Sequence, residues 1–189
     1  MLFRSTRGDS PSPDTICLLH PWLDARGTAS PVAVLTTPRP LLVTATPLYR
    51  IELRDAQTDI RLGAVEVAQG QAALPDPLPW PRQWPTLRPG ARYILKLQPS
   101  TSPDRAEVII AGGSPSAFAQ TQAQIERLGS RAIAWEQAIS ALLNSATSPN
   151  PANRALASTL LFASEAPPSE ALSELRQALK RANCTPLGR

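Results

Sequence analysis

The stretch LRPGARYILKLQ, residues 87–98, decides the fold class more than any other part of this chain. Apolar residues recur at every second position, so that Tyr93, Leu95 and Leu97 fall on one face, and most positions between them are polar. A period of two residues with opposite polarity on the two faces is typical of a half-buried β-strand. We therefore expect residues 92–98 to form a core strand.

The same alternation continues on both sides of this strand. Residues 48–54 place Tyr49, Ile51 and Leu53 on one face and charged residues on the other. Residues 60–67 repeat the pattern with a slip at Gly63-Ala64, which indicates a bulge. About seven strands at intervals of roughly 8–15 residues are typical of a β-sandwich. The remaining short runs are Ile16–Leu19, Pro31–Leu35, Leu41–Ala45 and Glu107–Ala111. The inward positions expected to centre the core are Tyr93, Leu95, Leu97, Ile51, Leu53 and Val108.

Two segments carry a family resemblance. LRPGARYIL, residues 87–95, resembles the corner that enters the sixth strand of fibronectin type III domains, where a Leu-x-Pro-Gly turn precedes a core tyrosine. Leu48–Asp55 is similar to the central strand of those domains, whereas Leu41–Ala45 lacks the tryptophan usual in the second strand. The resemblance covers about residues 31–112 and implies an antiparallel, Ig/fibronectin III-like β-sandwich.

Beyond Gly112-Gly113 the spacing of apolar residues changes to the helical period. Ser114 and Pro115 suit the N-cap and first position of a helix, and Ser130 is expected to cap the next one. Short connections between four helices predict two antiparallel helical hairpins. Trp135 is expected to anchor them. Its predicted neighbours are Leu160 and Leu175.

Two segments of this helical part are similar in sequence, which suggests an internal repeat. Residues 138–142 and 171–175 share a pattern at a fixed offset, which resembles tetratricopeptide repeats; a plain four-helix cap is the alternative. The chain is thus expected to be α+β, with a flexible arm (1–14), a β-sandwich domain (15–113) and a helical-hairpin unit (114–189). A proline-rich sandwich followed by helices is similar in layout to bacterial envelope accessory proteins with FecR-like regions.

Composition excludes several classes of function. The chain has 42% apolar residues, enough for a core, and a net charge of +4 without a basic stripe, so we expect no nucleic-acid partner. No apolar run is long enough to predict a membrane span. The first residues show no signal-peptide pattern, which predicts a cytoplasmic protein, with the periplasm or envelope as the alternative if the start is truncated.

Catalytic and metal-binding patterns are scarce. The single histidine means that any histidine-based acid–base mechanism must use His20. Cys17 and His20 offer only two metal ligands, and the strand-like Leu18-Leu19 between them separates the two side chains, so we expect a buried Cys17 and a surface His20. No phosphate-binding or nucleophile-elbow motif occurs. We expect no enzyme, no cofactor, no metal and no small-molecule ligand; whether Cys17 pairs with Cys184 stays open.

The segment Leu74–Gly90 is the most unusual, with six prolines and two tryptophans. Stiff backbone lowers the entropic cost of binding, and tryptophan and arginine are enriched where binding energy concentrates, so Trp80, Arg82, Trp84 and Arg88 form the hypothetical partner-binding site. Two alternatives stay open. The tryptophans cover the open end of the sandwich core, or they form a platform on which sugars stack.

Together these observations predict a non-enzymatic protein-binding or scaffold (adaptor) protein, whose partner is another protein of unknown identity. The alternative is a carbohydrate- or cell-wall-binding accessory module of the bacterial envelope. The two recognisable modules most often present binding surfaces, which favours the first.

Overall fold

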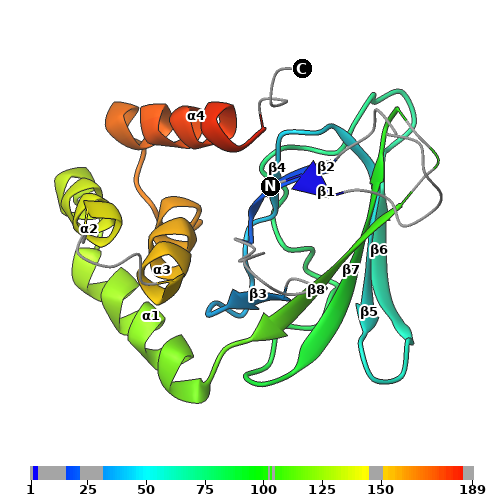
Figure 1. Ribbon diagram of the computed structural model, residues 1–189, viewed down its shortest axis with the longest axis horizontal. Helices are drawn as coiled ribbons and strands as arrows, with labels where there is room; N and C mark the ends of the chain where they lie inside the picture. The colour runs from blue at the N-terminus through cyan, green and yellow to red at the C-terminus, as the bar shows by residue number, and fades with distance from the viewer. Residues whose placement is uncertain are drawn as a thin grey trace.

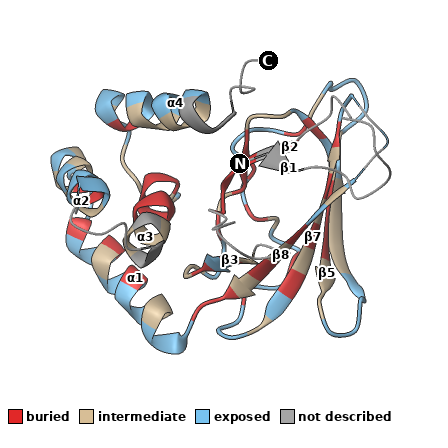
Figure 2. Ribbon diagram, viewed as in Figure 1, coloured by how far each residue is buried: buried red, intermediate tan, exposed pale blue. Residues whose placement is uncertain are grey.

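The computed structural model describes residues 2–3, 16–21, 32–101, 103, 105–144 and 151–184, and within them the chain is α+β, as predicted. The elements form three layers: a large sheet, a small sheet and a group of helices (Figure 1). Burial is concentrated on the strands and on α3, and much of α4 is exposed (Figure 2). The strands are β1 (Leu2–Phe3), β2 (Ile16–His20), β3 (Val32–Leu35), β4 (Val43–Thr44), β5 (Leu48–Asp55), β6 (Arg61–Glu66), β7 (Arg92–Pro99) and β8 (Ala106–Gly112). The helices are α1 (Pro115–Leu128), α2 (Ala132–Asn144), α3 (Pro151–Leu161) and α4 (Glu170–Cys184).

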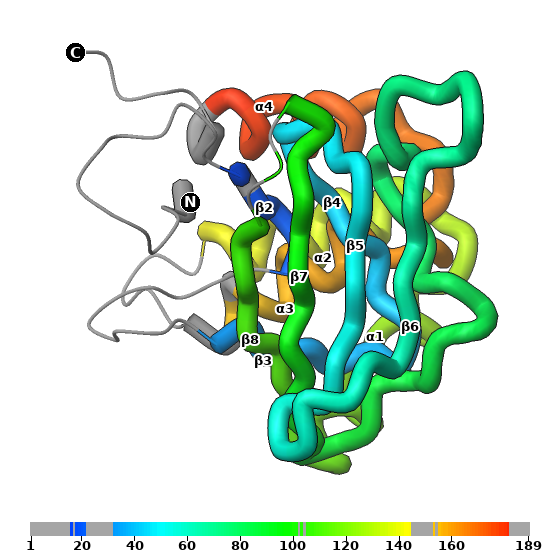
Figure 3. The backbone as a smooth tube through the Cα atoms, turned by 90° about the vertical axis from the view of Figure 1, so that its right-hand side faces the viewer, coloured from blue at the N-terminus to red at the C-terminus, as the bar shows by residue number. Residues whose placement is uncertain are grey.

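The large sheet has the strand order β3-β8-β7-β5-β6, and its four long strands lie side by side in Figure 3. All neighbours are antiparallel except β3 and β8, which are parallel. The expectation of a purely antiparallel sandwich is therefore wrong at this edge. The physical reason is the connection: after β3 the chain crosses to β4 in the small sheet, so β3 is not joined to β8 by a hairpin and its direction is not constrained by one.

The inward face of the large sheet is the predicted one. The six side chains expected to centre the core are buried and belong to one hydrophobic cluster. Tyr49, which the alternation places on the same face as Ile51 and Leu53, does not face the core. It is 38% exposed, and Leu48 is buried in its place. The pairing of β5 with β7 shifts register between Leu48 and Arg50, and a one-residue shift moves a side chain to the opposite face.

A second irregularity lies where the sequence predicts a bulge. Leu53 pairs with Gly63 and Arg54 pairs with Arg61, so the register shifts beside Gly63. A Cβ atom at position 63 would lie 2.3 Å from two atoms of the Trp84 indole. Glycine is therefore required here so that the Trp84 ring can pack against the backbone of β6.

The corner before β7 is held by one tyrosine. Ala91 N donates to Arg88 O at 3.2 Å, and Gly90 has φ +74°, as a type II turn requires. The hydroxyl of Tyr93 accepts a hydrogen bond from Arg88 N at 3.2 Å, which ties the core strand to the turn before it.

The small sheet, with strand order β1-β2-β4, is covered on both faces. Ile16 and Leu18 belong to the hydrophobic cluster shared with the large sheet, which we call the sandwich core. Leu19 and Val43 belong to a second cluster shared with the helices, which we call the helical core. The small sheet is therefore the middle layer of the molecule, and the register shift in the pairing of β2 with β4 after Leu18 occurs where β2 changes from one core to the other.

The helices follow the predicted breaks, with one correction at the start of α2. Ser114 Oγ accepts from Ala117 N at 3.1 Å, which confirms the first cap. Ser130 does not cap α2, because Arg131 O accepts the first helical hydrogen bonds. The two hairpins expected from the short connections are not confirmed, since the closest helix packing joins α2 to α3, and α4 packs on β2. Trp135 is buried in the helical core with Leu160 and Leu175, as expected, and its Nε1 donates to Gly129 O at 2.8 Å.

Replacing Leu95 tests the inward face. Leu95→Ala removes a fully buried side chain from the sandwich core, so the free energy of unfolding should fall by roughly 2–5 kcal/mol in urea denaturation. Ile94→Ala, on the opposite face of the same strand, is the matched control and should lose clearly less. Equal losses in the two variants would contradict the assigned orientation of β7.

Candidate functional site

The four residues predicted to contact a partner do not form one surface. Trp80 and Trp84 are buried in the sandwich core, with 5% and 2% of their surface exposed, whereas Arg82 and Arg88 are exposed. Trp80 Nε1 donates to Pro85 O at 3.0 Å, within its own loop. The rings are not accessible to a partner in the folded chain. The hypothesis of a tryptophan contact surface is corrected accordingly, and the arrangement matches the alternative in which the tryptophans cover the core.

A sugar platform at these rings has no geometric support. The Trp80 and Trp84 rings are 5.1 Å apart between centroids and meet at 89°, edge to face. Stacking on sugars needs ring faces that are open to solvent, and both rings are packed inside the protein. The sequence signal, aromatic residues among prolines, does not distinguish an exposed aromatic from one that a stiff loop folds back into the core.

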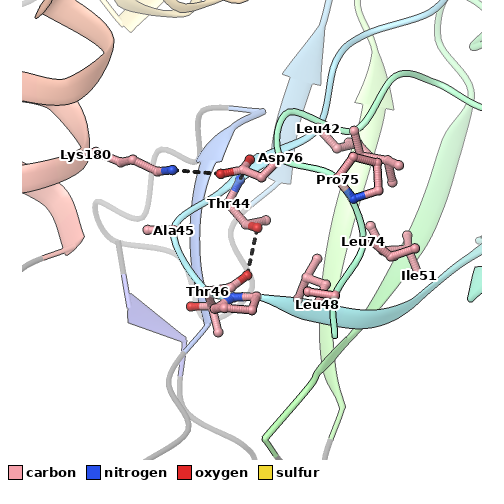
Figure 4. Close-up of a pocket in the computed structure, with 13 residues that line it drawn as sticks. Leu42, Thr44, Ala45, Thr46, Leu48, Ile51, Leu74, Pro75, Asp76 and Lys180 are labelled. Carbon is pink, nitrogen blue, oxygen red and sulfur yellow. Dashed lines mark hydrogen bonds and ion pairs between the residues drawn. The ribbon is translucent and has the colours of Figure 1, made fainter. Parts of the chain in front are cut away.

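A pocket with apolar walls and a polar rim lies at one end of the sandwich (Figure 4). This end pocket has a volume of about 270 Å³. Its floor is formed by leucines and an isoleucine that also belong to the sandwich core, and its rim by polar side chains from three separate segments. The apolar residues are Leu42, Leu48, Ile51, Leu74 and Leu78. The rim residues are Thr44, Thr46, Asp76 and Lys180.

Asp76 organises the rim of the end pocket. Its Oδ1 accepts a hydrogen bond from Thr44 N at 3.1 Å, and its Oδ2 pairs with Lys180 Nζ of α4 at 2.7 Å. Thr44 Oγ1 donates to Thr46 O at 2.9 Å. The carboxylate therefore joins the loop, the small sheet and α4, and these rim groups are engaged with one another rather than aligned as a nucleophile and a base.

A second pocket, which we call the corner pocket, is lined by the same ion pair. Its volume is about 300 Å³, and Asp76 and Lys180 line both pockets. Phe162, just after α3, and Arg176 of α4 form its helical side. Strand residues of the helical core form the opposite side. They are Leu19 and Val43.

His20 lies between the small sheet and the helices. Only 2% of its surface is exposed, so the expectation of a surface histidine is wrong; the helices cover β2 on the side that a two-layer sandwich would leave open to solvent. Nδ1 of His20 and Oγ of Ser158 are 3.1 Å apart, and the ring packs on Phe162 with centroids 5.7 Å apart. Burial lowers the pKa of His20 to about 4, so the imidazole is neutral at physiological pH.

In the described part of the chain, the His20–Ser158 pair belongs to no group of metal-ligating side chains. No cluster of three or more histidine, cysteine, aspartate or glutamate side chains occurs among the described residues. The sulfur atoms of Cys17 and Cys184 lie outside the described side chains. Of the expected arm, residues 1–14, only Leu2–Phe3 is described, and it forms β1. Ser158 supplies a hydrogen-bonding partner for the buried His20 and Phe162 an aromatic neighbour, and a buried polar side chain in a packed interface needs such a partner.

Comparison with known proteins gives no relative: no protein-family model, curated protein or solved structure matches this chain. In the part of the chain that the structure describes, no helix is both long and apolar enough to span a membrane.

The buried histidine predicts a pH-dependent stability. The folded chain keeps His20 neutral down to about pH 4, whereas the unfolded chain protonates it below pH 6.5. The unfolded state therefore binds more protons in this window, so the free energy of unfolding should fall as the pH drops through it, by about 3 kcal/mol in total.

Urea denaturation at several pH values within that window measures the effect. His20→Asn keeps a polar side chain near Ser158 but cannot titrate, so its stability should change less with pH than that of the wild type. Because His20 is the only histidine in the chain, no other imidazole contributes. Identical pH profiles for the two proteins would contradict a neutral, buried His20.

Proposed function

We propose that this chain is a non-enzymatic protein-binding adaptor, and that its end pocket receives an apolar side chain of the partner protein. The observation that carries the proposal is the composition of that pocket: its walls are core leucines, and its rim groups are already paired within the chain. Such a pocket gains free energy by losing water from apolar walls, and it offers no group poised for bond making.

The size of the pocket favours an anchor side chain. About 270 Å³ is below the usual range of pockets that enclose a whole small-molecule ligand. Protein interfaces concentrate their binding energy in a few large side chains that enter desolvated pockets. The floor is rigid because Leu48, Ile51 and Leu74 are each buried in the sandwich core, so little order has to be imposed on binding.

The rim supplies orientation. The side chains of Asp76 and Lys180 are about one-third exposed, so a partner backbone or polar side chain can reach them beside the apolar opening. A polar rim around an apolar centre is the usual anatomy of a protein interface. The proposed contact surface is therefore the end pocket and its rim, and no longer Trp80 and Trp84.

The finer description of the fold belongs to the same proposal. We infer that residues 32–112 are an Ig/fibronectin III-like sandwich, and the hydrogen bond from Arg88 N to the Tyr93 hydroxyl supports this, because a tyrosine that bonds back to the preceding corner is a hallmark of such domains. Modules of this kind frequently present binding surfaces, which agrees with an adaptor. The layout seen in envelope proteins with FecR-like regions stays a prediction.

Two neighbouring alanines provide the test. Ala73 lines the end pocket and is half-buried, whereas Ala72 is exposed and outside the pocket. Peptides selected from a random library on the purified wild-type chain should share an apolar anchor residue. Ala73→Trp should fill the pocket and weaken their binding by roughly 30-fold or more, and Ala72→Trp should leave it within about twofold.

Thermal melts of both variants establish that the folded fraction is the same in the binding titrations. Selected peptides that bind Ala73→Trp as tightly as the wild type would contradict the end pocket as the contact site. Failure to select any peptide with an apolar anchor would contradict the proposed function itself.

A further inference from the structure

Arg176 occupies an unusual position in the corner pocket. Its Nε donates to Leu161 O at 2.9 Å, at the last residue of α3, where a cation is favourable because carbonyl groups at a helix end lack partners. This bond holds the guanidinium through its Nε atom and does not use its two terminal amino groups. Arg176 itself lines the pocket.

No described carboxylate lies within 4.0 Å of Arg176, whereas Lys180, which lines the same pocket, pairs with Asp76. Burial lowers the pKa of Arg176, and no acidic group acts to raise it. A half-buried guanidinium without an acid is costly, and an anion that enters the pocket would relieve that cost.

The charge inside the corner pocket is therefore positive. Asp76 is the acid that lines it, and this carboxylate is occupied by Lys180 Nζ at 2.7 Å and by Thr44 N at 3.1 Å. Arg176 adds one cation that the pocket itself does not balance. The remaining walls are largely apolar, with the aromatic ring of Phe162 among them.

We propose that the corner pocket binds a small monocarboxylate with an apolar body, whose carboxylate pairs with the guanidinium of Arg176 and whose body lies against Phe162, Leu19 and Val43. The volume of about 300 Å³ is at the lower end of small-molecule pockets, which sets the ligand at small size. Arginine offers parallel N–H donors that match the two oxygens of a carboxylate. This site is independent of the proposed adaptor function.

The probe is 3-phenylpropionate, with 3-phenylpropanamide as a matched ligand of the same shape without the charge. Isothermal titration of the full chain should show binding of the acid, and binding of the amide should be weaker by about tenfold or more. Arg176→Gln should weaken binding of the acid to the level of the amide. Arg181→Gln removes the same charge from the same helix outside the corner pocket, so it should bind the acid like the wild type.

A second variant covers the case in which Arg176→Gln does not fold. Ala166→Leu keeps Arg176 and adds volume to the wall of the corner pocket, so it should also weaken binding of the acid. Ala73→Trp, in the end pocket, should leave binding of the acid unchanged, which separates this proposal from the adaptor function.

Equal binding of acid and amide would overturn the proposal, as would wild-type affinity for the acid in a folded Arg176→Gln or Ala166→Leu variant. A short peptide that ends in a free C-terminal phenylalanine is the last arm. Binding of that peptide more than about tenfold tighter than 3-phenylpropionate would overturn the small-molecule assignment and identify a protein C-terminus as the ligand.

Discussion

Burial of the small sheet on both of its faces is the constraint on which the rest of the structure depends. Ile16 and Leu18 face the sandwich core, and Leu19 faces the helical core, so one short strand stabilises both. A strand in this position must be apolar on either side, and any polar group it carries needs a partner. His20 meets that requirement through Ser158, a residue of α3.

The strands with one solvent-exposed face could be predicted from the sequence, whereas the strands that are buried on both faces could not. The alternation in β7 and in most of β5 identifies the sandwich core because polar residues mark the outer face. In β2 both sides are apolar, so nothing local reveals that helices cover its second face or that His20 is buried. Tyr49 was misplaced because a register shift, which depends on the pairing with β7, has no signal in β5 alone.

The candidate sites were beyond prediction for a related reason. Leu74 and Asp76 belong to the proline-rich segment Leu74–Gly90, but the binding hypothesis rested on its tryptophans, and both of these are buried. The rim of the end pocket forms only when Lys180 of α4 reaches Asp76, more than a hundred positions earlier in the chain. Spacing within a segment carries no information about a pair so distant, and the same holds for Arg176 of α4 and its partner Leu161 at the end of α3.

If both cores share the small sheet, the sandwich and the helices must unfold together. Native-state hydrogen exchange in increasing denaturant measures this directly, through the amides of Leu95 in β7 and Leu160 in α3, each in the centre of one core. Coupling of the two cores through the small sheet predicts that both amides exchange through the same global opening, with the same free energy and the same dependence on denaturant. Exchange of Leu160 through a separate opening of lower free energy, while Leu95 stays protected, would contradict it.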